Sequence, residues 1–144
     1  MSIKKDKGWY NDDSEYDKSG LLKFEGSYLN DEKNGKGREY NNGSLNFEGE
    51  YLNGQRWNGK GKEYYYNGQL IFEGEYLNGE RNGKGKEYWI VGKLVFEGEY
   101  KKGKRNGKGK EYNYDGKLEF EGEYLNGLRN EKGKEYNYND KLEI

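Results

Sequence analysis

The residue types that usually carry out enzymatic chemistry are scarce in this chain of 144 residues. It has no His, Cys or Thr, and its serines lack a neighbouring base pattern that would activate a nucleophile. The acidic cluster at 12–17 lacks the spacing of an EF-hand loop. The segment at 54–60 is similar to a phosphate-binding loop, but Gly61 follows where Ser or Thr would bind magnesium. We therefore predict that the protein is not an enzyme and has no catalytic, cofactor-binding or metal-binding residues.

The composition narrows the class of protein further. The 26 basic residues nearly balance the 27 acidic ones, for a net charge of -1, and the mean hydropathy is -1.49. Such a charge balance does not favour nucleic-acid binding. Aromatic residues reach 17%, which favours a folded chain over a disordered one. With no apolar run of membrane-spanning length and no signal-peptide pattern, we expect a cytoplasmic protein. Because we expect no catalytic residues, we also expect no small-molecule substrate.

An internal repeat of about 24 residues organises the chain. The string Phe-Glu-Gly-x-Tyr begins at Phe24, Phe47, Phe72, Phe96 and Phe120. The string Gly-Lys-Gly-basic-Glu-Tyr begins at Gly35, Gly59, Gly83 and Gly107, and an altered copy begins at Glu131. The second repeat has one extra residue near Trp57, and the segment before Phe47 is one residue shorter than its counterparts.

Each repeat has the pattern of two short strands. FEGEY alternates apolar or small residues with charged ones, which is typical of a half-exposed strand. Asn-Gly or Asp-Gly turns recur at 42–43, 67–68, 78–79, 115–116 and 126–127. We predict an all-β fold: an elongated, single-layer antiparallel meander, or solenoid, of β-hairpins. Residues 1–14 would form an N-terminal arm or cap, and residues 15–144 the repeat array of about five repeats.

A strand register follows from the charges. If Tyr100 faces Gly107, then Glu99 faces Lys108 and Glu97 faces Lys110. The same rule pairs Glu48 with Lys62 and Glu50 with Lys60 in the second repeat, and it matches acid with base almost everywhere.

This register has one exception and leaves one question open. Ser27 stands where the other repeats have Glu. One tyrosine per repeat lies two or four residues after the lysines of the same strand, so strict strand alternation would place it on the face that carries the lysines. These tyrosines are Tyr40, Tyr64, Tyr88, Tyr112 and Tyr136. Either a bulge switches the face of these tyrosines, or aromatic residues line both faces.

These spaced residues resemble the MORN repeat (membrane occupation and recognition nexus), in a 24-residue variant. The segment FEGEYLNGERNGKGKEY at 72–88 fits the family pattern closely. The resemblance implies one hairpin per repeat, stacked so that each repeat contacts only its neighbours.

Some of the aromatic residues indicate that the protein binds a partner protein. Trp57 lies in an insertion that periodic packing does not require, and Trp89 occupies a column of mainly Asn and Tyr. Together with Tyr64, Tyr88 and Tyr112, these are our candidate partner-binding residues. We predict a non-catalytic scaffold that mediates protein–protein interaction or self-association, through an aromatic face or an end of the array.

The alternative is peripheral binding to membranes. The segment 101–110 concentrates Lys101, Lys102, Lys104 and Arg105, and polybasic segments attract anionic phospholipid. Such binding would weaken strongly with added salt.

Overall fold

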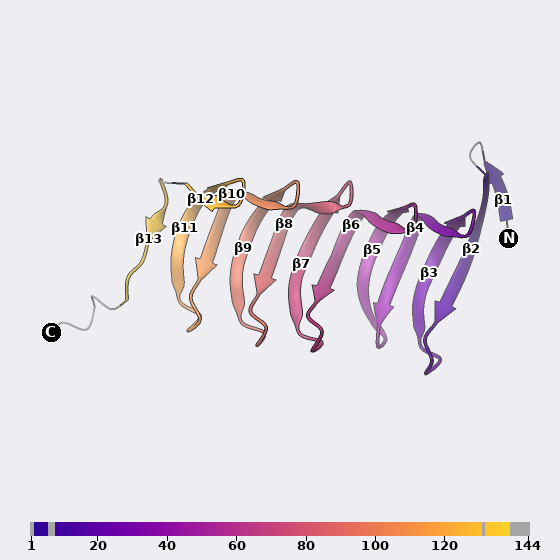
Figure 1. Ribbon diagram of the computed structural model, residues 1–144, viewed down its shortest axis with the longest axis horizontal. Coiled ribbons are helices and arrows are strands. Elements are labelled where there is room, and N and C mark those ends of the chain that lie inside the picture. Colours follow the sequence, from indigo (N-terminus) through magenta and orange to yellow (C-terminus); the bar gives the residue numbers. More distant parts are fainter. Residues whose placement is uncertain (1, 6–7, 131, 139–144) are drawn as a thin grey trace. The chain divides into compact units, whose positions relative to one another are not determined.

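The computed structural model describes residues 2–5, 8–130 and 132–138, with side chains from Asp12 onward. Within these ranges there is no helix, and so none that could cross a membrane. The strands are β1 (Ser2–Lys5), β2 (Gly8–Tyr16), β3 (Leu22–Leu29), β4 (Glu32–Asn41), β5 (Ser44–Leu52), β6 (Gln55–Tyr64), β7 (Leu70–Leu77), β8 (Glu80–Tyr88), β9 (Leu94–Lys101), β10 (Lys104–Tyr112), β11 (Leu118–Leu125), β12 (Leu128–Arg129) and β13 (Lys134–Glu135). The prediction of an all-β antiparallel meander of hairpins is confirmed (Figure 1).

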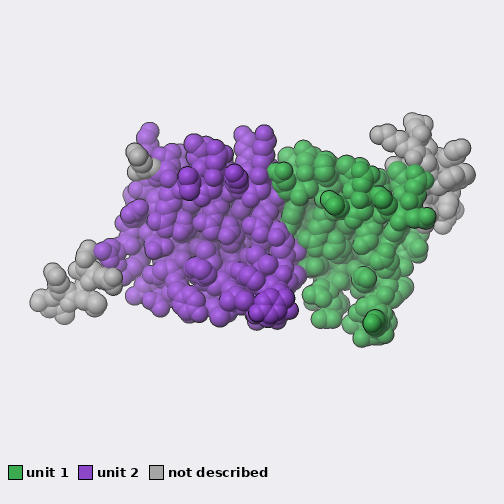
Figure 2. All heavy atoms as spheres, viewed as in Figure 1, with its two compact units in different colours: residues 1–61, 76–80 green, residues 62–75, 81–144 purple. Residues whose placement is uncertain are grey.

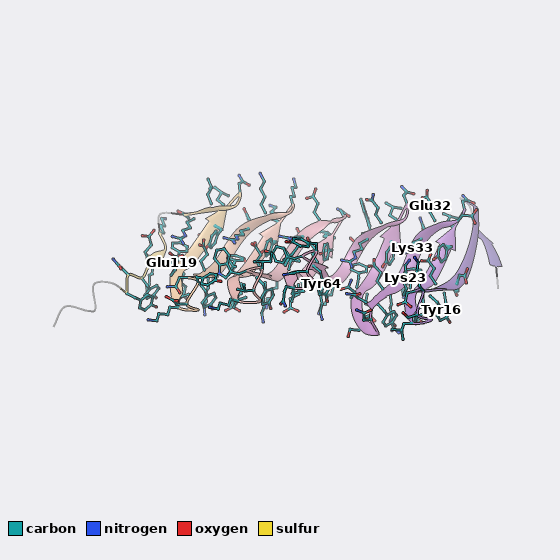
Figure 3. All side chains as sticks on the ribbon, turned by 60° about the horizontal axis from the view of Figure 1, so that its bottom comes forward. Tyr16, Lys23, Glu32, Lys33, Tyr64 and Glu119 are labelled. Carbon is teal, nitrogen blue, oxygen red and sulfur yellow. The ribbon has the colours of Figure 1, made fainter. Side chains whose placement is uncertain are left out.

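The chain forms two compact units. Unit 1 comprises residues 1–61 and 76–80, and unit 2 comprises residues 62–75 and 81–144 (Figure 2). In unit 1 each strand from β1 to β6 pairs antiparallel with the next along the chain. In unit 2 the strands from β8 to β12 do the same, and β13 pairs with β11. Side chains leave the strands on both faces (Figure 3).

Two kinds of turn connect the strands. Within a repeat the turn has two residues, such as Asn126-Gly127, and both have positive φ. Between most repeats the turn is longer: the N–H of Gly92 donates to Trp89 O, and the N–H of Trp89 donates to Lys93 O. Only the Gly has positive φ there, as in a type I turn with a G1 bulge. The shortened segment at 42–43 closes with the two-residue turn instead.

The core of each unit is a row of phenylalanines seated on glycines. Phe24 and Phe47 in unit 1, and Phe72, Phe96 and Phe120 in unit 2, are at most 2% exposed. A Cβ added to Gly109 would lie 2.5 Å from the Phe96 ring. Tyrosine rings pack edge-on between the phenylalanines, with centroids 5.6 Å (Phe96–Tyr100) and 5.0 Å (Phe96–Tyr124) apart. This packing explains why the repeat keeps glycine beneath each ring.

In the hairpin of β9 and β10 the predicted register is correct only near the middle. Glu97 faces Lys110 and Gly98 faces Gly109, as expected. Nearer the turn, however, Tyr100 faces Arg105 rather than Gly107, because β10 bulges between Arg105 and Gly109. The Glu99 carboxylate therefore accepts the backbone N–H of Lys108 at 3.0 Å. Lys108 itself lies opposite Glu123 of the next strand, so acid still faces base, but across the neighbouring ladder.

The second repeat departs further from the predicted register. Glu48 faces Lys60, not Lys62, and Glu50 faces Asn58, not Lys60. The residue inserted near Trp57 is accommodated by a smaller bulge, between Glu50 and Tyr51, which brings Gly49 opposite Gly59. The expected pairs of this repeat are therefore wrong by two residues.

Aromatic residues line both faces of the sheet, which answers the question about the tyrosine column. The hydroxyls of Tyr40 and Tyr112 donate to Glu25 and Glu97, at 2.8 and 2.6 Å, on the face that carries the basic column. A bulge does occur beside Tyr112, where the ladder to β11 shifts by one residue. It does not bring Tyr112 to the phenylalanine face.

The strand β2 extends the sheet on the N-terminal side of β3. Part of the expected arm or cap at 1–14 therefore belongs to the sheet. Asp12 lies opposite Ser27, and the Ser27 hydroxyl donates to its carboxylate at 2.8 Å. A Glu at position 27 would face Asp12 with like charge, which accounts for the one exception in the charge pattern.

We predict that Gly109→Ala destabilises the protein by about 1–3 kcal/mol, the usual cost of overpacking a core. The added Cβ would lie 2.5 Å from the Phe96 ring. Urea unfolding measures the effect, and the exposed Lys110→Ala is the matched control, expected within about 0.5 kcal/mol of the wild type. In the Gly109→Ala background, Phe96→Leu should recover part of the loss. A Gly109→Ala protein as stable as the control would contradict this account of the core.

Candidate interaction surfaces

The phenylalanine face is closed by arginines. In unit 2 the Arg105 guanidinium lies 4.3 Å from the centroid of the Phe96 ring. Two of its N–H groups donate to the Glu87 carboxylate, at 3.0 and 2.9 Å, and the Tyr100 hydroxyl donates to the same carboxylate. Phe96, Tyr100, Arg105 and Glu87 together form what we call the arginine cluster. It links β8, β9 and β10, and so joins one repeat to the next.

The arginine cluster recurs along the chain. In unit 1 Arg56 lies over Phe47 and pairs with Glu39, which also accepts the Tyr51 hydroxyl. In unit 2 Arg129, Glu111 and Tyr124 repeat the arrangement over Phe120. Lys33 takes the place of Arg above Phe24, with its ammonium 4.3 Å from the ring centroid.

The carboxylates of these clusters have lowered pKa values. Burial is the largest influence on Glu87 and by itself would raise its pKa. Hydrogen bonds from Arg105 and Tyr100, with the positive charge of the guanidinium, outweigh burial, so the Glu87 pKa lies below its ordinary value. The pKa values of Glu39 and Glu111 are lowered in the same way. The carboxylates of the clusters are therefore ionised at neutral pH, and their hydrogen bonds and ion pairs with arginine compensate for their partial burial.

Most of the aromatic residues predicted to bind a partner already contact other residues of this chain. The hydroxyls of Tyr88 and Tyr112 donate to Glu73 and Glu97, each at 2.6 Å. Burial, and then the bond to Glu97, raises the pKa of Tyr112 to about 12. Tyr64 is half-buried.

The two tryptophans differ from each other. Trp57 is half-buried, and its ring lies where a Cβ on Gly79 would be 3.4 Å away. Trp89 is 38% exposed and occupies a turn between two repeats. The structure thus places Trp57 in unit 1 and Trp89 in unit 2.

Trp89 belongs to an exposed apolar surface that the sequence prediction missed. Its other members lie in the same turn or in the equivalent turns of unit 2, and all five residues are at least 38% exposed: Tyr66, Trp89, Ile90, Val91 and Tyr114. We call this surface the turn ridge. The equivalent turns of unit 1, at 17–20 and 41–44, carry polar residues instead. The sequence contains a pattern that could have indicated this surface. YWIVG and YYYNG place apolar or aromatic residues where a turn normally has polar ones.

Neighbouring turns of the turn ridge contact one another. The Trp89 and Tyr114 rings have centroids 6.0 Å apart. The Lys93 ammonium donates to Tyr114 O at 3.1 Å and lies 4.5 Å from the Tyr114 ring centroid. The Tyr65 hydroxyl donates to Tyr88 O at 3.0 Å. These contacts hold the three turns side by side as one surface.

The predicted basic surface lies at the other end of the strands. The turn between β9 and β10 exposes Lys101, Lys102 and Lys104, whereas Trp89 precedes the start of β9. Arg105 is not available to a ligand, because the arginine cluster holds it and a second ion pair joins it to Glu111 at 3.4 Å. The two predicted surfaces are therefore separate.

The charged face of unit 1 forms a shallow groove. Its volume is about 1260 Å³, and acidic and basic side chains alternate along it, among them Asp12, Glu25, Lys36 and Arg38. Arg38 is paired there with Glu48 at 2.7 Å. Among the described residues, no group of three or more His, Cys, Asp or Glu side chains could hold a metal ion. The groove has no arrangement that indicates a specific ligand.

The fold and these surfaces define a repeat protein of stacked β-hairpins. The family model of the MORN repeat matches this chain five times, over residues 24–45, 47–70, 72–93, 96–117 and 120–140. The chain belongs to the MORN-repeat family. The comparison with curated proteins gave no match.

We predict that Glu87→Gln lowers the free energy of unfolding at pH 7 by about 1.5–3 kcal/mol, the value of a hydrogen bond to a charged group. The folded-state pKa of Glu87 lies below its ordinary value. Its stabilisation is therefore present above the unfolded-state pKa and is lost as the pH falls through the folded-state pKa.

The pH dependence tests this assignment. The difference between wild type and Glu87→Gln should shrink below about pH 4.5, where the unfolded-state carboxyl begins to bind protons. Urea unfolding from pH 7 to pH 2.5 measures it. The exposed Glu121→Gln serves as control and should differ little from the wild type at any pH. A Glu87→Gln deficit that stays constant down to pH 2.5 would show that the lost stability is not electrostatic.

Proposed function

We propose that this chain is a non-catalytic MORN-repeat scaffold that binds a partner protein through the turn ridge. The observation that carries the proposal is the contrast between turns: those of unit 2 expose Tyr66, Trp89, Ile90, Val91 and Tyr114, and those of unit 1 are polar. Packing does not account for the contrast, because the same backbone turn closes between Asp17 and Leu21 with polar residues at its tip.

The size of the turn ridge supports a binding role. A large aromatic side chain offers about 150–250 Å² of surface. The exposed fractions of Tyr66, Trp89 and Tyr114 (97%, 38% and 55%) give roughly 400 Å², and the smaller Ile90 and Val91 bring the total to roughly 500 Å². The largest apolar patch of an ordinary monomer measures about 300–600 Å² and is often functional. Aromatic residues are also the side chains most often found at the energetic centre of an interface.

We predict that the turn ridge selects peptides that a ridge variant cannot bind. A phage library of random twelve-residue peptides is panned against the immobilised wild type. The variant Trp89→Ala/Ile90→Ser/Val91→Ser is used for counter-selection. Enriched peptides should lose at least tenfold in affinity for this variant, because they lose the centre of the surface.

A matched variant controls for nonspecific binding to exposed aromatic residues. Tyr16 of unit 1 is 62% exposed and lies outside the turn ridge, so Tyr16→Ala should bind the enriched peptides like the wild type. Because the substituted ridge residues are exposed, circular dichroism melts of all variants should agree within a few degrees. No enrichment over the variant would remove the basis of the proposal.

Membrane attachment is the second candidate, and one observation favours it. Three exposed lysines, Lys101, Lys102 and Lys104, meet at one turn. Near an anionic membrane each contributes about 1 kcal/mol. The cytoplasmic location and the lack of nucleic-acid partners stay predictions from the sequence.

We predict that any flotation with vesicles of 30% phosphatidylserine is lost on Lys101→Ala/Lys102→Ala/Lys104→Ala. It should also fall sharply between 50 and 300 mM salt, because exposed charges are screened. Trp89→Ala should float like the wild type if the lysines act alone. Flotation that ignores salt and the lysines, or no flotation at all, would rule out this mode.

A further inference from the structure

We propose that the occupant of the turn ridge is a proline-rich segment in the polyproline II conformation. The inference rests on the proposed function and specifies the chemistry of the partner. It begins from the spacing of the turns. Successive turns of the ridge are two strands apart, which is about 9.6 Å at the usual spacing of strands. A polyproline II helix repeats every three residues, or about 9.3 Å. Every third residue of such a segment would therefore meet one turn.

The residues at equivalent positions of the three turns suit this occupant. Tyr66, Ile90 and Tyr114 follow one another at intervals of 24 residues. Trp89 precedes Ile90 in the same turn, and its ring centroid lies 6.0 Å from that of Tyr114. Proline rings pack on aromatic side chains, and a proline-rich segment loses little conformational entropy on binding because its helix is already formed.

Hydrogen bonding favours the same occupant. A polyproline II backbone makes no internal hydrogen bonds, so its carbonyl oxygens are free to accept. Tyr66 is 97% exposed and Tyr114 is 55% exposed, and each hydroxyl can donate to such a carbonyl. The ammonium of Lys93, next to the turn that holds Trp89, already contacts the Tyr114 carbonyl and ring. The five residues of the turn ridge themselves offer aromatic rings, aliphatic groups and hydroxyls, and no charge.

The area of the turn ridge argues against a second copy of this chain as the occupant. A stable dimer buries about 800 Å² on each partner, whereas the ridge exposes roughly 500 Å². A short extended segment needs no more than this. None of the 144 residues is a proline, so the segment lies outside this sequence.

Isothermal titration calorimetry with blocked oligoprolines of four, seven and ten residues tests the proposal. Seven residues place positions i, i+3 and i+6 over the three turns. The affinity should therefore rise at least tenfold from four residues to seven and less than threefold from seven to ten. A Gly-Ser decapeptide should not bind. Affinity that climbs steadily with length, or no heat with millimolar decaproline, would overturn the proposal.

Variants locate the binding. Trp89→Ala and Tyr114→Ser should each weaken heptaproline binding at least tenfold, whereas Tyr16→Ala in unit 1 should leave it unchanged. Equal weakening by Tyr16→Ala, or none by Trp89→Ala, would place the binding elsewhere and contradict the proposal. All three side chains are exposed, so thermal melts should show that the variants remain folded.

The peptide panning described above separates the two levels of inference. Ridge-dependent peptides with prolines three residues apart support both the function and the ligand. Ridge-dependent peptides without proline leave the proposed function standing and overturn the proline-rich ligand. If no peptide depends on the ridge, both are overturned.

Discussion

The structure depends on a phenylalanine ring resting on two glycines that face each other across a hairpin. Gly98 and Gly109 lie opposite each other, and the ring of Phe96 covers them. A single-layer sheet has no second layer to bury its apolar side chains, so each ring must be enclosed within its own repeat and the next. The glycines let the ring lie against the backbone, and an arginine covers its other face. A chain this polar can therefore still exclude water from its phenylalanines.

The arginine that covers each ring also connects the repeats. Arg105 reaches Glu87 of the preceding hairpin, and that carboxylate accepts the hydroxyl of a tyrosine packed beside the same ring. The partial burial of the ion pair is tolerated because its charges are matched and hydrogen-bonded. Apolar packing and charge pairing thus act through the same few residues, and this explains why the array needs few aliphatic side chains.

These demands leave few positions free for recognition. One face is occupied by rings and arginines, and the other by opposed acids and bases together with the tyrosines that bond to them. The tips of the longer turns between repeats take no part in this packing, because the turn geometry requires only a glycine at the last position. They are the positions where a sequence can change without disturbing the core, and here they become apolar in unit 2 alone.

The sequence by itself determined the repeat, the hairpins and the family, because all of these follow from short-range periodicity. It also predicted that Glu97 faces Lys110. It did not predict the bulge between Arg105 and Gly109 or the altered register around Trp57, because a bulge reflects how a strand meets both of its neighbours. The exposure of the turn ridge and the half-buried position of Trp57 were likewise decided by tertiary structure, since exposure depends on what packs against a residue.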